Sequence, residues 1–182
     1  MNSLAEALGM SLTGCAAIPA PYRERAQMAY DTGFRCVHLV EQDIKPSDIM
    51  TKDAFQNAIV TASAIGASTN APPHIIAIAK NLNINLTLDD WEKWGEKIPL
   101  LVNLQPAGDY LGEGFFQAGG VPTVMNELLK NNKLKNKALT VTGKAIEDNI
   151  ENIKKIENKI IKDFEKPLKE KAGFLVFLVE KT

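Results

Sequence analysis

Cysteine and histidine are scarce in this sequence. Its 182 residues include two cysteines, Cys15 and Cys36, and two histidines, His38 and His74. Two cysteines are too few for the disulfide framework of a small secreted protein. The four residues are also scattered without a Cys-x-x-Cys pair, whereas metal sites built from such ligands need several of them at close spacing. The residues alone therefore indicate neither a disulfide scaffold nor a metal centre.

Long apolar runs are also missing. No stretch approaches the roughly 20 apolar residues that a helix needs to span a bilayer, and nothing resembles a secretory signal. With 45% hydrophobic and 24% charged residues, the composition is typical of a globular protein with a core. We therefore expect a cytoplasmic protein without a membrane partner.

Arginine is absent after Arg35, and the last part of the chain is rich in lysine instead. Residues 130–182 contain 13 lysines and eight acidic residues, whereas residues 1–129 contain eight basic and 14 acidic residues. Single-stranded nucleic acids are bound by basic grooves interleaved with aromatic residues, but these lysines alternate with Glu and Asn. The pattern favours a solvated helix face, and we expect no nucleic-acid partner.

Helical and extended patterns alternate along the chain. Caps and helical periodicity predict helices over residues 2–9, 22–42, 54–65, from 71, from about 88, over 121–129, and from 145 to about 158. Apolar runs predict short strands at 99–104, 138–145 and 173–180, with a loop over most of 105–122. This alternation predicts the α/β fold class.

Isolated residues that could carry chemistry are better explained by packing. His38 lies within a helical pattern and is predicted to be a partly buried structural histidine. Cys15 lies in a loop with no base placed near it, so a small buried residue is the better interpretation. Trp91 and Trp94 are three residues apart on one helix face and are expected to pack in a core or an interface.

The stretch 63–80, "SAIGASTNAPPHIIAIAK", holds the best candidate site. Ser68, Thr69 and Asn70 come directly before a helix whose opening prolines lack N–H groups, which suits a first turn. The N-terminal end of such a helix attracts carboxylate or phosphate. A site for a polar substrate and a capped core helix both fit these residues, and the residues alone favour the capped helix.

Six segments of the chain resemble the dihydroxy-acid and sugar-acid dehydratase family. They occur in the family's order and cover nearly the whole chain: "MNSLAEALGMSLTGCAAIPAPYRERAQMAY", "FQNAIVTASAIGASTNAPPHIIAIA", "LTLDDW", "PLLVNLQPAGDYLGEGFFQAGGVPTVMNELL", "ALTVTGK" and "PLKEKAGF". The version "GCAAIPAPYRERAQ" is most similar to the branch of arabinonate-like dehydratases.

This resemblance implies a hydro-lyase that converts 2,3-dihydroxy acids to 2-keto acids, in branched-chain amino-acid synthesis or sugar-acid catabolism. Family members use an iron–sulfur cluster and Mg²⁺ and form homodimers. Metal ions can stabilise both the leaving hydroxide and the charge that develops as a proton leaves the carbon beside the carboxylate. Ser68, Thr69 and Asn70 match the family's Gly-Gly-Ser-Thr-Asn loop, which implies substrate positioning and not bond breaking.

The resemblance also implies that the ligands of both cofactors lie outside this chain. The family's cluster cysteines precede the segment that matches Met1, and its base serine belongs to a part beyond Thr182. We therefore expect no catalytic or metal-binding residue here. Residues 1–140 are expected to be the later part of an N-terminal parallel-sheet domain, and residues 141–182 the linker and start of a C-terminal β-barrel domain.

On this basis the chain is expected to be an inactive part of a dehydratase, marginally stable and prone to aggregate. The alternative is a cofactor-free fragment that binds an anion or a sugar acid, or that has a structural role. Three positions depart from the family: Thr13 replaces a proline, Ala67 replaces the second glycine of the loop, and residues 175–182 differ from the usual continuation. An alanine at 67 is costly if its backbone needs a positive φ.

Overall fold

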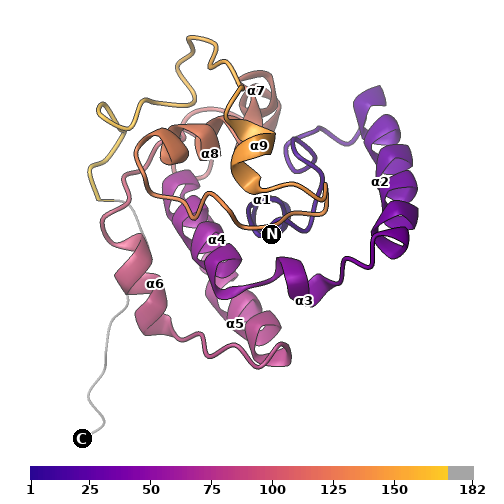
Figure 1. The fold of residues 1–182 in the computed structure, drawn as a ribbon. Coiled ribbons are helices and arrows are strands. Elements are labelled where there is room, and N and C mark those ends of the chain that lie inside the picture. The colour runs from indigo at the N-terminus through magenta and orange to yellow at the C-terminus, as the bar shows by residue number, and fades with distance from the viewer. Residues whose placement is uncertain (172–182) are drawn as a thin grey trace, which may run out of the picture.

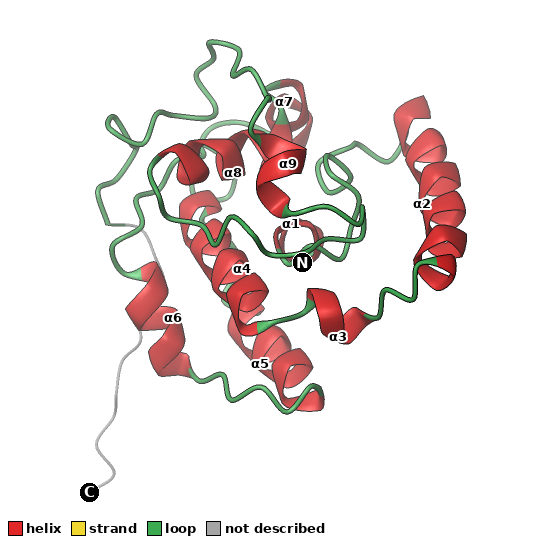
Figure 2. Cartoon of the chain, viewed as in Figure 1, coloured by secondary structure: helices red, strands yellow, loops and turns green. Residues whose placement is uncertain are grey.

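The computed structural model describes residues 1–171, and helices dominate them (Figures 1 and 2). In chain order the helices are α1 (Asn2–Ala7), α2 (Arg23–Glu41), α3 (Pro46–Ile49), α4 (Lys52–Ile65), α5 (Ala71–Asn81), α6 (Leu88–Gly95), α7 (Gly112–Gln117), α8 (Gly120–Lys130) and α9 (Ile146–Ile150). The predicted helices at 2–9, 22–42, 54–65, 71 onward, 88 onward and 121–129 are confirmed. The predicted strand at 173–180 lies outside the described residues.

Local capping explains where the central helices begin and end. The hydroxyl of Thr51 accepts a hydrogen bond from the backbone N–H of Ala54 (3.4 Å), so Thr51 caps α4. Gly66 closes α4 with a left-handed backbone at φ 65°. At α6, the Asp90 carboxylate accepts from the backbone N–H of Thr87 (2.9 Å), which completes a capping box.

The core is built around α4. Ten of its 14 residues are buried, and it contacts α1, α5, α6 and α8. Figure 1 shows α4 near the middle of the molecule with these helices around it. Phe55 on α4 and Trp91 on α6 are both fully buried, whereas Trp94 packs partly buried against the core. The prediction that the two tryptophans serve packing is confirmed.

The described residues form no regular sheet, and this limits the α/β prediction. The segment 99–104 is extended and its residues Leu100, Leu101 and Val102 are buried, but it makes only isolated bridges. Leu100 pairs antiparallel with Lys169, and Val102 with Ile161. The 138–145 segment likewise closes with one antiparallel bridge. Within residues 1–171 the fold is therefore helical with a few bridges, without the expected parallel sheet.

Two segment predictions are wrong. The expected loop at 105–122 contains α7 and the first residues of α8. The expected helix over 145–158 ends at Ile150, because the chain beyond it pairs with another segment. The backbone of Lys162 donates to Leu101 O (2.8 Å), and the backbone of Asn103 donates to Ile160 O (2.8 Å). These long-range hydrogen bonds hold residues 160–162 extended despite helical periodicity in their isoleucines.

Helix α2 differs from the others because none of its 19 residues is buried. It stands at the edge of the molecule in Figure 1, connected to the rest by α3 and by the loop that precedes Tyr22. Between residues 1 and 171, no helix is both long enough and apolar enough to cross a bilayer.

Candidate functional site

The candidate site is the loop that joins α4 to α5. Gly66 supplies the left-handed backbone, and the backbone N–H of Ala67 donates to Ala62 O (2.9 Å). Ala67 itself is not among the residues with a positive φ. The alanine in place of the family's second glycine therefore carries no left-handed strain in this structure.

Ser68, Thr69 and Asn70 lie together on this loop and are exposed. The hydroxyl of Ser68 accepts from the backbone N–H of Asn70 (3.2 Å), and Ser68 O accepts from the backbone N–H of Ala71 (2.9 Å). Within residues 1–171, the backbone N–H groups of Ser68 and Thr69 donate to no protein acceptor. The loop therefore offers two backbone donors and polar side chains to the solvent.

Helix α5 gives this loop a rigid base. Its Ala71, Ile75 and Ala79 are buried against the core, which accounts for the capped-helix interpretation. His74 is exposed on the other side of the helix, with nothing that would make it a ligand. One face of α5, including Ala71 and Pro72 at its start, thus packs in the core, while the loop before it is exposed. The two interpretations of this stretch are therefore compatible.

A second polar loop follows a segment that is hydrogen-bonded to the last turn of α4. The backbone of Leu101 donates to Ala64 O (2.8 Å), which ties the 98–104 segment to the last turn of α4. This segment runs into a loop closed by two side-chain contacts: Asn103 Nδ2 donates to Asp109 Oδ2 (3.1 Å), and the backbone N–H of Asp109 donates to Asn103 Oδ1 (2.8 Å). The sequence predicted this region as loop but gave no reason to pair these residues.

Sequence reasoning also missed a buried carboxylate. Glu6 on α1 is 5% exposed, and its two oxygens accept from the backbone N–H groups of Gly14 and Ala16, each at 2.7 Å. Burial raises the pKa of Glu6, against the opposing effect of these two hydrogen bonds. Glu6 therefore fixes the start of the loop that leads to α2. Its only sequence signal is an acid between Leu4 and Ala7 on an otherwise apolar turn.

The far end of that loop is held by Tyr22. Its hydroxyl donates a hydrogen bond to the carboxylate of Glu113 on α7, and its ring packs edge-on against Phe116 with centroids 5.6 Å apart. The hydrogen bond to Glu113 raises the pKa of the Tyr22 hydroxyl. Glu6 and Tyr22 thus hold the two ends of one loop, and neither was predicted to do so.

Among the described residues, the remaining candidates do not form a metal site. Cys15 is half-buried and Cys36 is exposed, and both line a cavity of about 230 Å³ between α2 and the loop before it. His38 is partly buried as predicted, with Nδ1 2.8 Å from the Glu41 carboxylate. Among residues 1–171, no three His, Cys, Asp or Glu side chains gather closely enough to hold a metal ion. These residues do not fit an iron–sulfur cluster, which needs several thiolates.

Comparison with known proteins decides the family. Residues 1–149 match the family described as dihydroxy-acid/6-phosphogluconate dehydratase, N-terminal. The chain belongs to this dehydratase family. The match covers the Ser68–Asn70 loop, the buried Glu6 and every helix from α1 to α8.

Three relatives show the range of the family. A D-xylonate dehydratase of Caulobacter vibrioides is 56% identical over 97% of this chain and 29% of its own length. An L-arabinonate dehydratase of Rhizobium leguminosarum bv. trifolii is 48% identical over 94% of this chain and 30% of its own length. A dihydroxy-acid dehydratase of Acetivibrio thermocellus is 43% identical over 97% of this chain and 32% of its own length.

This dehydratase chain therefore spans about three tenths of the length of the curated relatives that it matches. The resemblance drawn from six sequence segments is confirmed, including its likeness to sugar-acid dehydratases.

Proposed function

We propose that this chain is part of the N-terminal domain of a hydro-lyase that removes water from a sugar acid or another 2,3-dihydroxy acid to give a 2-keto acid. The observation that supports this is the family match over residues 1–149, together with 56% identity to a D-xylonate dehydratase. The acids named by the relatives share a carboxylate, and the dehydration requires neighbouring hydroxyl groups. We place this enzyme in the cytoplasm.

Within that enzyme, we assign the Ser68–Asn70 loop to substrate positioning. Its two open backbone N–H groups lie at the N-terminal end of α5, where donors and the helix dipole favour a carboxylate. The Ser68, Thr69 and Asn70 side chains can add hydrogen bonds to hydroxyl groups. The buried face of α5 keeps the loop in place, as a positioning site requires.

We assign the iron–sulfur cluster and Mg²⁺ to the parts of the enzyme outside residues 1–171, because the described residues gather no ligand set for either. No bond-breaking step is therefore assigned to this chain. We also propose that the linker and the start of a second domain follow residue 140. The absence of a regular helix between Ile150 and Lys171, where the chain pairs by antiparallel bridges, supports this.

The positioning role is tested by titrating the ¹⁵N-labelled 182-residue chain with D-xylonate and following its backbone amide signals. We expect the Ser68 and Thr69 signals to shift with D-xylonate and not with D-xylose, which lacks the carboxylate. The Ser68→Ala/Asn70→Ala variant should weaken the response. Shifts confined to other parts of the chain, or equal shifts with the neutral sugar, would contradict the assignment.

The same loop supports a second candidate function, a fragment that binds sugar acids without catalysis. Its exposed donors belong to this chain alone and need no cofactor. Anaerobic reconstitution with iron and sulfide separates the two parts of the proposal. We expect no cluster absorption from this chain, and a cluster bound by the purified chain would show that its two cysteines serve as ligands after all.

A further inference from the structure

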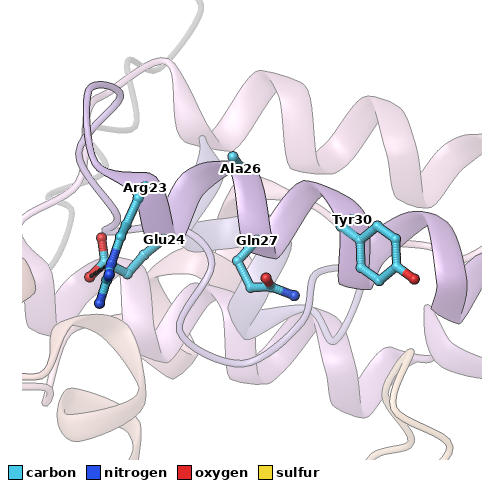
Figure 3. A pocket seen from close by; sticks show the side chains of 5 residues that line it. All are labelled: Arg23, Glu24, Ala26, Gln27 and Tyr30. Atoms are coloured by element: carbon cyan, nitrogen blue, oxygen red, sulfur yellow. Dashed lines mark ion pairs between the residues drawn. The ribbon is translucent and has the colours of Figure 1, made fainter.

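Two hollows adjoin α2, and they differ in what encloses them. The larger has a volume of about 610 Å³, and Figure 3 shows the side chains that line it on one stretch of the helix: Arg23, Glu24, Ala26, Gln27 and Tyr30. The smaller, of about 230 Å³, is the cavity between α2 and the loop before it, which we call the α2 cavity. Its walls come from α2, from the loop at residues 10–15 and from Val141 on the segment before α9. Because three segments enclose it, the α2 cavity is the better candidate for a ligand site.

The walls of the α2 cavity are mostly apolar. Their apolar or weakly polar side chains are those of Met10, Leu12, Cys15, Cys36, Leu39 and Val141. The hydroxyl of Thr32, which also lines the cavity, donates to Met28 O of its own helix (2.7 Å). Protein interiors rarely leave voids larger than a water molecule, and an apolar cavity of about 150 Å³ is enough to hold benzene. The α2 cavity therefore has the size and the walls for a small apolar ligand.

One cation lines the α2 cavity, the guanidinium of Arg35. Its Nε donates to the backbone carbonyl of Val141, and its Nη2 donates to Gln42 Oε1 (2.7 Å). A β-carbon at Gly143 would lie 2.8 Å from the same Nη2, so the guanidinium also lies against this turn. These contacts hold the Arg35 side chain in place, and they use two of its five N–H donors. The other donors are available to a ligand.

The charge of Arg35 has no carboxylate partner among residues 1–171. The two groups that it bonds, a backbone carbonyl and a side-chain amide, are neutral, and the ion pairs of these residues do not include it. No Asp or Glu of this part of the chain lines the α2 cavity. A carboxylate in the cavity would therefore meet a fixed cation without a competing anion. The planar guanidinium also matches a carboxylate in bidentate geometry.

We propose that the α2 cavity binds a small apolar carboxylic acid. The apolar body lies among Leu12, Leu39 and Val141, and the carboxylate accepts hydrogen bonds from the remaining donors of Arg35. This site shares no residue with the Ser68–Asn70 loop and goes beyond the proposed dehydration. A sugar acid does not suit it, because the several hydroxyl groups of a sugar acid would lose their hydrogen bonds to water among apolar walls.

Titration of the ¹⁵N-labelled 182-residue chain with 4-methylpentanoate tests the class of ligand. We expect saturable shifts of the Leu12, Cys36 and Leu39 amide signals, with a dissociation constant of roughly 1 mM because so small a ligand makes few contacts. 4-Methylpentanamide, which has the same apolar body without the charge, should bind about tenfold more weakly. Acetate, which has the charge without the body, should give no saturable shift. Equal binding of the acid and the amide, or no saturable shift with the acid, would overturn the proposal.

A matched pair of substitutions on α2 tests the location of the site. Leu39→Trp fills the α2 cavity and should abolish the saturable shifts. Val40→Trp is the control, because Val40 is 81% exposed and does not line the cavity, so the dissociation constant should stay unchanged. Far-ultraviolet circular dichroism checks that both variants fold. Binding that persists in Leu39→Trp, or that both substitutions abolish, would place the ligand elsewhere and contradict the proposal.

A cysteine of the cavity wall gives a second measurement, on the unmodified chain. Cys15 is half-buried and lines the α2 cavity, so a bound acid should shield its thiol from iodoacetamide. With 4-methylpentanoate at about ten times its dissociation constant, alkylation of Cys15 should be about tenfold slower, whereas acetate at the same concentration should leave the rate unchanged. Mass spectrometry of the digested chain follows Cys15 and Cys36 separately. If the acid does not slow the alkylation of Cys15, the α2 cavity is not its binding site.

Discussion

Helices α4 and α2 are the two longest in the described part of the chain, and they differ in almost every contact. Ten residues of α4 are buried among α1, α5, α6 and α8, whereas α2 buries none of its 19 residues. Both helices were predicted from caps and periodicity, which are local signals. The difference teaches that local signals decide whether a helix forms, while its partners decide what the helix contributes to stability.

Composition gives part of the difference in advance. The α4 sequence "AFQNAIVTASAI" places small or apolar residues on all sides, so other helices can pack around it. Its polar Asn57 can be buried there because its side chain forms hydrogen bonds with the backbone of Lys135. The α2 sequence carries charged residues on several sides. Its Tyr30–Phe34–Val37 stripe nevertheless has the spacing of a core face. Only the structure shows that this stripe points outward.

The largest expected effect comes from truncating one phenylalanine on each helix. Phe55 on α4 is fully buried, so Phe55→Ala should lower the free energy of unfolding by about 3–5 kcal/mol through lost burial and a cavity. Phe34→Ala on α2 should change it by less than about 0.5 kcal/mol, because Phe34 is 61% exposed. Urea unfolding at low protein concentration measures both. Similar losses in the two variants would show that α2 packs in solution.

Glycine substitutions should give effects of opposite sign in the two regions. A β-carbon at Gly95 of α6 would lie 2.5 Å from the hydroxyl of Ser63 on α4, which is buried and bonded to Ile59 O (3.0 Å). Gly95→Ala should therefore destabilise the fold by about 1–3 kcal/mol. At Gly33 of α2 a β-carbon meets no atom within 4 Å.

Gly33→Ala should instead stabilise the helix by about 0.5–1 kcal/mol, since alanine loses less backbone entropy than glycine. Thermal unfolding of the two variants beside the unmodified chain is the measurement. A loss of stability in Gly33→Ala would place a close neighbour beside α2 and remove the contrast between the two helices.

The buried carboxylate of Glu6 should make the stability of the folded chain depend on pH. Glu6→Gln leaves one of the backbone N–H groups of Gly14 and Ala16 without its acceptor and should cost about 1–2 kcal/mol at pH 7. Because burial raises the pKa of Glu6 above 4.5, the folded chain holds the Glu6 proton more tightly than the unfolded chain. The stability of the unmodified chain relative to the variant should thus increase as pH falls from 7 toward 4.5.

The control for this prediction is Glu41→Gln on α2. Its exposed side chain should contribute less than about 0.5 kcal/mol to the free energy of unfolding. A stability difference between Glu6→Gln and the unmodified chain that is constant from pH 4.5 to 7 would mean that the Glu6 carboxylate is solvated.

The helices could be predicted where the signal is local, whereas the early end of the helix predicted at 145–158 goes with a distant partner. Thr51 and Gly66 bound α4 through their own backbone neighbours, so sequence alone located that helix. The predicted helix ends at Ile150 instead of near residue 158, and the chain after it pairs with a segment almost 60 residues earlier, as the bridge between Val102 and Ile161 shows. No periodicity within one segment carries this information.

In the candidate site, too, residues with a local sequence signal could be predicted and residues with distant partners could not. The Ser68–Asn70 loop was identified because its polar residues and the following prolines are adjacent in sequence. Glu6 was missed because its partners, Gly14 and Ala16, are backbone groups, which any residue could supply. Tyr22 was missed because Glu113 is 91 residues away. Side chains that act on distant backbone or on a distant element leave little mark on the sequence around them.

The smallest expected effect concerns an exposed carboxylate, the counterpart of Glu6. Asp163 lies in the irregular segment after α9, and its pKa is lowered because the ammonium of Lys155 hydrogen-bonds to it at 2.6 Å. Lys155→Ala should return the pKa of Asp163 toward its ordinary value of 3.8. The stabilisation from this pair is present above pH 3.8 and is lost as pH falls through the lowered pKa.

Because Asp163 is well exposed, the loss of this pair should cost less than about 1 kcal/mol, whereas the pKa change is directly visible in an NMR titration of its carboxyl carbon. Lys166→Ala, which removes a lysine that lowers the pKa of Asp163 through its charge alone, is the matched control. If both variants moved the pKa of Asp163 equally, the general positive charge of the lysine-rich segment would be its cause. Burial would then explain the raised pKa of Glu6, and net charge, not a specific partner, would explain the lowered pKa of Asp163.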